Sequence, residues 1–348
     1  MIIGIIVGKD DYYTDKIKPY VKLFGNKFLT KSSYISSDVA IAYRLLNDYS
    51  HKNIKVDIML AKDVTVERLK HNDINYVLGH DLVDAFWRKK KDSESGYYEE
   101  FTKIYKNPSC NIFPLYNLQK FVLDKGKYYE FFKNNGIPVL DTFYIKNNTI
   151  INTKKIINKI KSLGWIEFIT KPELGAWGLY FKKWKINDST IENKLTKYLN
   201  NKNIKRFPSI IFQQLAPDFK NYWEIRTFWF NNKFSHAIGT KHHFEDGYDD
   251  VVTKISPDIL NQCKNIGRKT LKVIPKMIIN GKEIKPLMIR IDCGCCLNGK
   301  NGKYFLNEIE NQACNLFIED VEKMGVDITG IFSKAIYNKT KEILNIKN

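Results

Sequence analysis

The chain has 348 residues, of which 43% are hydrophobic and 14% aromatic, and its 56 Lys and Arg against 38 Asp and Glu give a formal charge of +18. This supply of apolar side chains excludes a disordered chain, and at about 150 residues per domain the length predicts two or three domains. The sequence holds no apolar run of about 18 residues, which excludes a transmembrane helix. We therefore do not expect a membrane as a partner. We interpret the short apolar start, residues 1–8, as a buried first strand and not as a signal peptide, because it lacks a basic region before the apolar one.

The positive charge has two explanations. A basic protein can bind nucleic acid. Lys, Asn, Ile and Tyr are also all encoded by AT-rich codons, so a biased genome yields the same mixture without selection for a polyanion. The charge is concentrated, because residues 146–207 hold 14 basic and 4 acidic side chains, whereas residues 1–116 hold 18 and 15. We favour the compositional explanation over a nucleic-acid partner, and leave open whether the basic region 146–207 binds a polyanion.

The cysteines do not form a recognisable metal motif. No Cys-x-x-Cys pair occurs, and no His lies near the densest group, residues 293–296. We therefore expect reduced, buried thiols in a cytoplasmic protein rather than zinc ligands. The six are Cys110, Cys263, Cys293, Cys295, Cys296 and Cys314.

Residues 1 to about 115 alternate between strand and helix patterns. Strands are predicted at 2–7, 56–60 and 74–78, with helices at 39–49 and 66–70 between them. This order favours a small parallel sheet. No Gly-x-Gly-x-x-Gly follows the first strand, so the sequence excludes the usual dinucleotide-binding fingerprint.

Two segments carry residues suited to a nucleotide. In 168–181 an apolar strand ends at Lys171, and a loop with Gly175 and Gly178 precedes a second strand. A lysine can reach phosphate oxygens, and glycines let backbone N–H groups approach them. A hairpin with a surface lysine explains the same pattern.

The second segment is 209–217, an apolar strand with a polar end. It finishes on Gln213 and Gln214, followed by Leu215 and Ala216. A strand that leaves its sheet here exposes backbone donors and acceptors of the kind an adenine needs. The alternative is a plain edge strand before a turn.

A third pair of segments, 287–292 and 304–311, places charged residues at every second position. These are Arg290 and Asp292 in the first, and Glu308 and Glu310 in the second. The Gly- and Asn-rich turn between them favours an antiparallel hairpin, which would put all four on one sheet face. Three buried carboxylates are costly unless a cation neutralises them, and hard oxygen ligands suit Mg²⁺ held together with phosphates. The alternative is a solvent-facing strand pair; we favour the site.

In this order the segments resemble the ATP-grasp superfamily over about residues 117–320, in particular its D-alanine–D-alanine ligase and glutathione synthetase-like members. Asp124-Lys125, a helix, and Gly136-Ile137-Pro138 resemble the element that holds the family's first nucleotide-binding lysine. Lys171-Pro172 resembles the second lysine, and residues 173–178 the glycine-rich lid, with Ala176-Trp177 where the family usually has Ser and Gly. Residues 213–216 resemble the hinge that binds adenine, with Gln214 where Glu is commoner.

The metal-binding strands carry the remaining resemblance. Arg290-Ile291-Asp292 is similar to the family's Arg-Val-Asp. Residues 307–310, Asn-Glu-Ile-Glu, are similar to its Asn-Glu-Val-Asn, with Glu310 in place of the last Asn. The Ser-Pro-Gly that often follows is absent.

The resemblance implies an α/β (α+β) chain with the ATP-grasp fold. A Rossmann-like N-terminal domain, 1–116, would precede a lid-bearing subdomain, 117–207, and a C-terminal subdomain with the metal site, 208–348. The two α+β subdomains would clasp ATP between them.

The resemblance also implies an enzyme that phosphorylates a carboxylate with ATP and joins the acyl phosphate to an amine or thiol, acting on small-molecule or peptide substrates. Lys125 and Lys171 would bind the α- and β-phosphates, and Asp292, Glu308 and Glu310 would hold Mg²⁺ or Mn²⁺. Arg290 would stabilise charge on the transferring phosphoryl group.

Lys241 is a candidate contact to the γ-phosphate; a surface lysine fits equally well. The loop 242–250 after it suits a mobile substrate loop. A metal site there is disfavoured, because His242 and His243 are adjacent on a strand and would point to opposite faces.

Two alternatives remain. One is a kinase of the same fold that phosphorylates a polyanion such as an inositol phosphate. The other, of a different class, is a non-catalytic protein that keeps the fold and binds nucleic acid or a partner.

Overall fold

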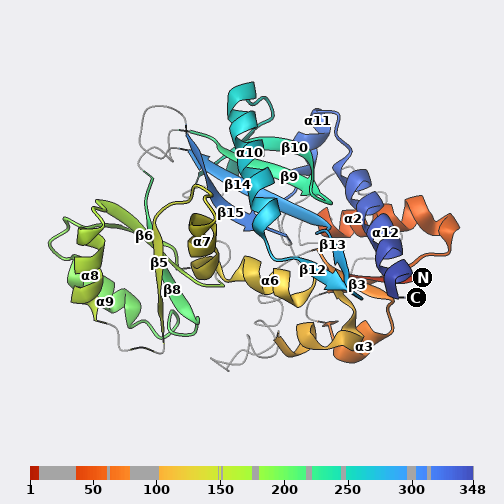
Figure 1. The fold of residues 1–348 in the computed structure, drawn as a ribbon, viewed down its shortest axis with the longest axis horizontal. Coiled ribbons are helices and arrows are strands. Elements are labelled where there is room, and N and C mark those ends of the chain that lie inside the picture. Colours follow the sequence, from red (N-terminus) through yellow and green to blue (C-terminus); the bar gives the residue numbers. More distant parts are fainter. Residues whose placement is uncertain are drawn as a thin grey trace.

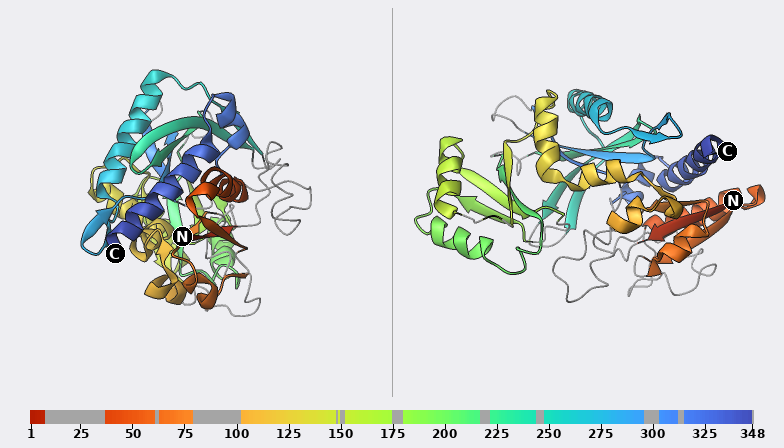
Figure 2. Two further views of the ribbon diagram at one scale, coloured as in Figure 1. Left: turned by 90° about the vertical axis from the view of Figure 1, so that its right-hand side faces the viewer. Right: turned by 60° about the horizontal axis from the view of Figure 1, so that its bottom comes forward.

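The computed structural model describes most of the chain as three lobes in a row, with both termini at one end (Figure 1). The lobe with the termini holds a parallel sheet, the middle lobe a five-stranded sheet, and the far lobe a four-stranded sheet (Figures 1 and 2). The described residues are 1–7, 37–60, 63–78, 102–147, 149, 152–174, 180–216, 222–243, 248–295, 303–311 and 315–347.

The N-terminal lobe confirms the predicted parallel sheet. Its strand order is β2-β1-β3-β4, and every pairing is parallel. The apolar start of the chain is its central strand, buried from Ile3 to Val7. The elements are β1 (Ile2–Val7), α2 (Ser37–Tyr49), β2 (Lys55–Leu60), α3 (Val66–Lys70), β3 (Ile74–Val77) and β4 (Ile112–Phe113), with short 3₁₀ helices at Ser50–Lys52 and Pro108–Cys110.

The C-terminal helix α12 (Ile328–Lys347) packs on this N-terminal lobe, beside α2 (Figure 1). The rings of Tyr49 and Tyr337 stack with their centroids 4.3 Å apart. The hydroxyls of Tyr76 and Thr340 lie 3.0 Å apart in the buried interior. The last helix therefore joins the two ends of the chain into one core.

The far lobe is an antiparallel sheet in the order β5-β8-β6-β7, covered on one face by α8 and α9. Phe168, Trp184 and Phe212 pack together beneath these helices. β7 begins at Lys182, later than the sequence suggested, because Tyr180 takes a positive φ of 56° and ends a turn. The elements are β5 (Thr142–Lys146), α8 (Thr153–Ser162), β6 (Glu167–Pro172), β7 (Lys182–Lys185), α9 (Ile191–Leu199) and β8 (Ser209–Gln214).

The middle lobe is built on the sheet β11-β10-β9-β14-β15, with α10 against one face. Two helices, α6 (Tyr116–Leu123) and α7 (Lys125–Asn134), connect it to its neighbours. The other elements are β9 (Glu224–Phe230), β10 (Lys233–His243), β11 (Tyr248–Val252), α10 (Pro257–Val273), β12 (Met277–Ile279), β13 (Lys282–Ile284), β14 (Met288–Cys295), β15 (Tyr304–Glu310) and α11 (Ile318–Lys323).

Within the described ranges, no helix combines the length and apolar character needed to cross a bilayer. Four cysteines, Cys110, Cys263, Cys293 and Cys295, are buried free thiols, as the sequence predicted. Cys296 and Cys314 lie outside the described residues.

The contact of α10 with the middle sheet predicts that Gly267→Ala destabilises the protein. A Cβ at Gly267 would lie 2.4 Å from the indole of Trp229, which is buried. Alanine favours a helix by about 1 kcal/mol over glycine, but overpacking costs about 1–3 kcal/mol, so we expect a net loss. Urea unfolding measures it, with Asn265→Ala on the exposed side of α10 as the control. A Gly267→Ala variant more stable than the control would contradict this packing.

Candidate active site

The predicted hairpin of charged residues is present and lies within the middle sheet. β14 pairs with β15 in antiparallel register, with Arg290 opposite Glu310 and Asp292 opposite Glu308. Because directly opposed residues share a face, all four side chains lie on the same side of the sheet. This is the face away from α10, since Trp229, which packs against Gly267 of that helix, is opposite Ile289.

Arg290 holds two of the carboxylates. Its Nε and Nη2 donate to the two oxygens of Asp292 at 2.8 and 2.7 Å, and Nη2 also lies 2.6 Å from Glu310 Oε2. The side chains of Arg290 and Asp292 are only 5% and 3% exposed. This is the bidentate geometry that a buried guanidinium–carboxylate pair needs to offset its desolvation.

Lys125 holds the third carboxylate from a different element. It is the first residue of α7, and its ammonium forms an ion pair with Glu308. The approach is fixed by the segment after α7, because Leu306 N donates to Pro138 O at 2.8 Å and Val139 forms a bridge with Leu306. The predicted first nucleotide lysine and a predicted metal ligand thus lie in direct contact.

The electrostatics of these groups divide the carboxylates into two kinds. Burial opposes ionisation of Glu308, but Lys125 and Lys171 outweigh it and lower its pKa to about 2. The pKa of Lys125 is raised, since Glu308 and Glu310 outweigh its burial. Burial, together with the charges of Glu308 and Asp292, outweighs Arg290 and raises the pKa of Glu310 to about 7. Glu308 is therefore ionised at neutral pH, whereas Glu310 is close to half protonated.

Lys171 reaches the same region from β6. Its ammonium donates to the hydroxyl of Tyr129 at 3.3 Å, and that hydroxyl donates to the carbonyl of Asn307 at 2.5 Å. By its register, Lys171 lies on the face of the four-stranded sheet opposite to α8 and α9. Tyr129 therefore links the two predicted phosphate lysines through β15.

Two further charged residues extend the cluster onto β9. Arg226 is opposite Asp292 in the register, and it pairs with Glu224 at 3.2 Å. Glu224 also accepts from Asn307 Nδ2 at 2.6 Å, and burial raises its pKa despite Arg226. Asn307 reaches Glu224 because a β-bulge beside Asp292 shifts the register there, which the sequence pattern did not reveal.

The predicted adenine hinge lies where β8 ends. Gln214 N donates to Asp141 O at 2.9 Å and Leu215 N to Glu167 O at 3.1 Å. Gln213 donates from its side chain to Thr142 Oγ1 at 3.0 Å. Ala216 is buried against Leu140 and Phe305, so the hinge is packed against the middle lobe.

The hinge and Lys171 belong to paired strands. Gln214 is opposite Phe168 and Ile211 is opposite Lys171, so three residue rises, about 10 Å, separate the two positions along the sheet. Gln213 and Lys171 lie on the same face.

One predicted site residue, Lys241, lies apart from this cluster. Thr240 is opposite Glu224, which places Lys241 on the other face of β10, where its ammonium lies 4.9 Å from the centre of the Trp223 ring. Gly175 and Gly178 lie outside the described residues, as do the side chains of His242 and His243.

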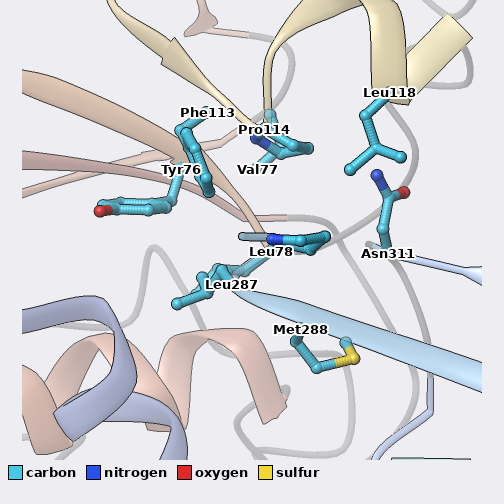
Figure 3. Close-up of a pocket in the computed structure, with 10 residues that line it drawn as sticks. Tyr76, Val77, Leu78, Phe113, Pro114, Leu118, Leu287, Met288 and Asn311 are labelled. Carbon is cyan, nitrogen blue, oxygen red and sulfur yellow. The ribbon is translucent and has the colours of Figure 1, made fainter. Parts of the chain in front are cut away.

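A small cavity of about 10 Å³, room for about one water molecule, lies between the N-terminal lobe, α6 and the start of β14 (Figure 3). Its walls are mostly apolar, and Figure 3 shows the carboxamide of Asn311 next to Leu118. Met288 precedes Arg290 by two residues on the same face, and Asn311 follows Glu310. The cavity is far too small for a nucleotide.

In the described part of the chain, no three acidic, His or Cys side chains converge to hold a metal ion as they stand. Instead, the carboxylates form ion pairs with Lys125 and Arg290. The donor set itself fits a hard divalent cation, because Asp292, Glu308 and Glu310 all offer carboxylate oxygens.

The chain resembles known proteins in its three-dimensional structure but not in its sequence. No protein-family model and no curated protein matches the sequence. A solved D-cycloserine synthetase, DcsG, matches with a TM-score of 0.65 and 14% identity over 98% of this chain and 100% of the other. The chain has the ATP-grasp fold.

Other solved structures with the ATP-grasp fold agree. D-alanine–D-alanine ligase from Bacillus anthracis matches with a TM-score of 0.61 and 13% identity over 100% of both chains. The ATP-grasp ligase PsnB, complexed with minimal precursor, Mg and ADP, matches with 0.52 and 12% over 97% of both chains. At these identities the likeness establishes the fold, including the N-terminal lobe.

The Lys125–Glu308 pair predicts a pH-dependent loss of stability in Lys125→Met. Removing the ammonium leaves a largely buried carboxylate without its cation, which costs about 3 kcal/mol at pH 7. Glu308, whose pKa is lowered from 4.5 to about 2, contributes stability that is present above pH 4.5 and lost as the pH falls through 2. The difference between wild type and variant should therefore shrink below pH 4.5 in urea unfolding.

Two variants control this experiment. Lys125→Met combined with Glu308→Gln should recover part of the loss, because the unpaired charge is gone. Lys133→Met breaks an exposed pair with Asp141 and should change the unfolding free energy by less than about 1 kcal/mol. Equal losses in Lys125→Met and Lys133→Met would show that the buried pair has no special role.

Proposed function

We propose that the protein is an ATP-dependent ligase that activates a carboxylate as an acyl phosphate and joins it to an amine or thiol. The observation that carries this proposal is the charged face of the middle sheet, where Arg290, Asp292, Glu308 and Glu310 meet Lys125 within the ATP-grasp fold. The solved neighbours complexed with ATP, and with Mg and ADP, support the same ligands here.

Each group on the face has a task in this chemistry. The ammonium groups of Lys125 and Lys171 bind phosphate oxygens, and Gln214 to Ala216 bind the adenine through the backbone. Asp292, Glu308 and Glu310 hold Mg²⁺, which when bound neutralises the phosphates and polarises the phosphoryl group. Arg290 is rigidly held, so its guanidinium stabilises charge that develops on the transferring phosphoryl group and on the tetrahedral intermediate.

The ion pairs of the free protein support this assignment. Lys125 and Arg290 keep the carboxyl groups of the face in place, and Lys125 keeps Glu308 ionised, while no phosphate is bound. When a triphosphate binds, the ammonium of Lys125 turns to its oxygens, while Arg290 stays in place. Few charges then have to be desolvated anew, because they exchange one oxygen anion for another.

We propose that the substrates bind on the side of the charged face that is nearest to the N-terminal lobe. We propose that acceptor selectivity comes from the N-terminal lobe, which borders the cavity beside Met288 and Asn311, and from the loop after His243. Small-molecule or peptide carboxylates and amines are the expected substrates. The buried free thiols suit a reducing, cytoplasmic location.

The central experiment measures ATP turnover and identifies its product. Purified protein should gain thermal stability from Mg-ATP, and should release ADP when supplied with pools of amino acids, peptides and polyols. An amide or thioester product supports the ligase, whereas a phosphorylated acceptor supports the kinase. Protein that neither binds Mg-ATP nor is stabilised by it would contradict both and favour a non-catalytic role.

Asp292→Asn and Glu308→Gln test the charged face directly. Both should lower ATP turnover by at least about 100-fold, since each removes a carboxylate that the phosphates' cation needs. Circular dichroism should show folded protein. Asp320→Asn, which affects only an exposed pair with Lys323, serves as the matched control and should turn over ATP like the wild type. Activity of Asp292→Asn close to that of the control would remove this residue from the mechanism.

A further inference from the structure

Tyr129 is a buried residue of the site that the sequence pattern does not single out. It lies on α7 four residues after Lys125, so the two side chains share one face of the helix. Tyr129 is only 1% exposed. It contacts β15 of the middle sheet through Asn307, and β6 of the far lobe through Lys171. Tyr129 therefore lies where the elements that carry the two phosphate lysines meet.

The hydroxyl of Tyr129 has fixed donor and acceptor roles. A phenol carries one proton, so it donates a single hydrogen bond and accepts others through its lone pairs. It donates to Asn307 O at 2.5 Å, since a carbonyl can only accept. Its lone pairs accept from the ammonium of Lys171 at 3.3 Å, a group that can only donate. The hydrogen bonds thus run in one direction, from β6 through α7 to β15.

The ring of Tyr129 restrains Lys171 as well. The ammonium lies 5.3 Å from the ring centre, within the range of a cation–π contact. The ring itself packs against the buried ring of Tyr128, and the two ring centres are 4.6 Å apart. A lysine has a flexible four-carbon stem that takes many rotamers when it is not held. Tyr129 therefore restricts the position of the Lys171 ammonium through both its hydroxyl and its ring.

The two phosphate lysines are held in different ways. Lys125 forms a buried ion pair with Glu308, whereas Lys171 forms no ion pair with any residue that the structure describes. An ammonium has three donors, and a neutral hydroxyl uses one of them without neutralising the charge. Tyr129 can therefore keep Lys171 in place both before and after the ammonium binds an anion.

We propose that Tyr129 is a positioning residue that holds the ammonium of Lys171 where the phosphates of ATP bind and fixes it relative to β15. The inference rests on the proposed nucleotide site. Because Lys171 belongs to the far lobe and Asn307 to the middle lobe, the same hydroxyl also sets how the two lobes face each other at the phosphates. The adenine hinge at Gln214 is about 10 Å from Lys171 along the sheet, so the role of Tyr129 concerns the phosphates alone.

Tyr129→Phe tests the hydroxyl alone, because it keeps the ring. Mg-ATP affinity, measured by isothermal titration calorimetry, should fall about 5- to 20-fold, as for the loss of one long hydrogen bond to a charged group. Adenosine, which lacks phosphates, should bind the variant and the wild type equally in equilibrium dialysis. A merely structural role would weaken the binding of both ligands alike.

A double-mutant cycle tests whether Tyr129 acts through Lys171. Lys171→Met should lower Mg-ATP affinity about 100-fold, because it removes the cation. In that background Tyr129→Phe should lower it by less than about twofold, since no ammonium is left to position. Thr340→Val is the control for stability. It removes another buried hydroxyl, 3.0 Å from that of Tyr76 where α12 packs on the N-terminal lobe, and it should bind Mg-ATP like the wild type.

The outcomes separate this role from the proposed function. Wild-type protein that does not bind Mg-ATP contradicts the nucleotide site, and the role of Tyr129 fails with it. If the wild type binds Mg-ATP, three results overturn the role of Tyr129 alone. These are an unchanged affinity in Tyr129→Phe, equal losses for Mg-ATP and adenosine, and additive losses in the double-mutant cycle.

Should Tyr129→Phe not fold, the wild type supplies the test. In protein isotopically labelled at lysine Cε, the ring of Tyr129 should shift the Hε resonance of Lys171 upfield in the NMR spectrum. The resonance is assigned by its absence from Lys171→Met, and Mg-ATP should change its position. A Lys171 resonance at the position of exposed lysines such as Lys155 would overturn the role of Tyr129.

Discussion

The structure depends on how four charged side chains share one largely buried sheet face. Arg290 holds Asp292 and Glu310, and Lys125 holds Glu308. Each of these ions, left alone in the interior, would cost several kcal/mol, so the face is tolerated only with this geometry. Because Lys125 comes from α7 and the others from β14 and β15, satisfying the charges also fixes the helix that leads into the far lobe. The ion pair of Lys125 with Glu308 therefore both neutralises a buried charge and fixes the position of α7.

The same constraint affects the protonation of the carboxyl groups while it fixes the positions of the side chains. Burial first, and the charges of Glu308 and Asp292 after it, raise the pKa of Glu310, whose side chain, at 27% exposed, is more accessible than those of Arg290 and Asp292. The side chains of Arg290 and Asp292 are held in place by their hydrogen bonds before any ligand binds, which is the preorganisation that electrostatic catalysis requires.

Local pattern predicted the elements and the hairpin, because period-2 alternation assigns each residue of a strand to a face. Arg290, Asp292, Glu308 and Glu310 were predicted together for that reason and lie together. Alternation alone does not say which face is the functional one, so Lys241 was a candidate although it lies on the α10 side. Asn307 was missed in its contact with Glu224 because a bulge shifts the register by a residue.

In the basic region 146–207, the effect of a charged side chain depends on the face of the lobe on which it lies. Lys171 lies on the inner face of its sheet and reaches Tyr129, whereas Lys155 and Lys161 are on the exposed side of α8. Charges on that outer side face water and salt, which screen them within about 10 Å, so they cost the fold little and add little to a site in the next lobe. Burial, ahead of the neighbouring Asp124, raises the pKa of Glu173 to about 8, so this carboxyl group holds a proton at neutral pH. The net charge of the far lobe therefore says little about its site. What matters there is the small number of charged side chains, such as Lys171, on the sheet face opposite to α8 and α9.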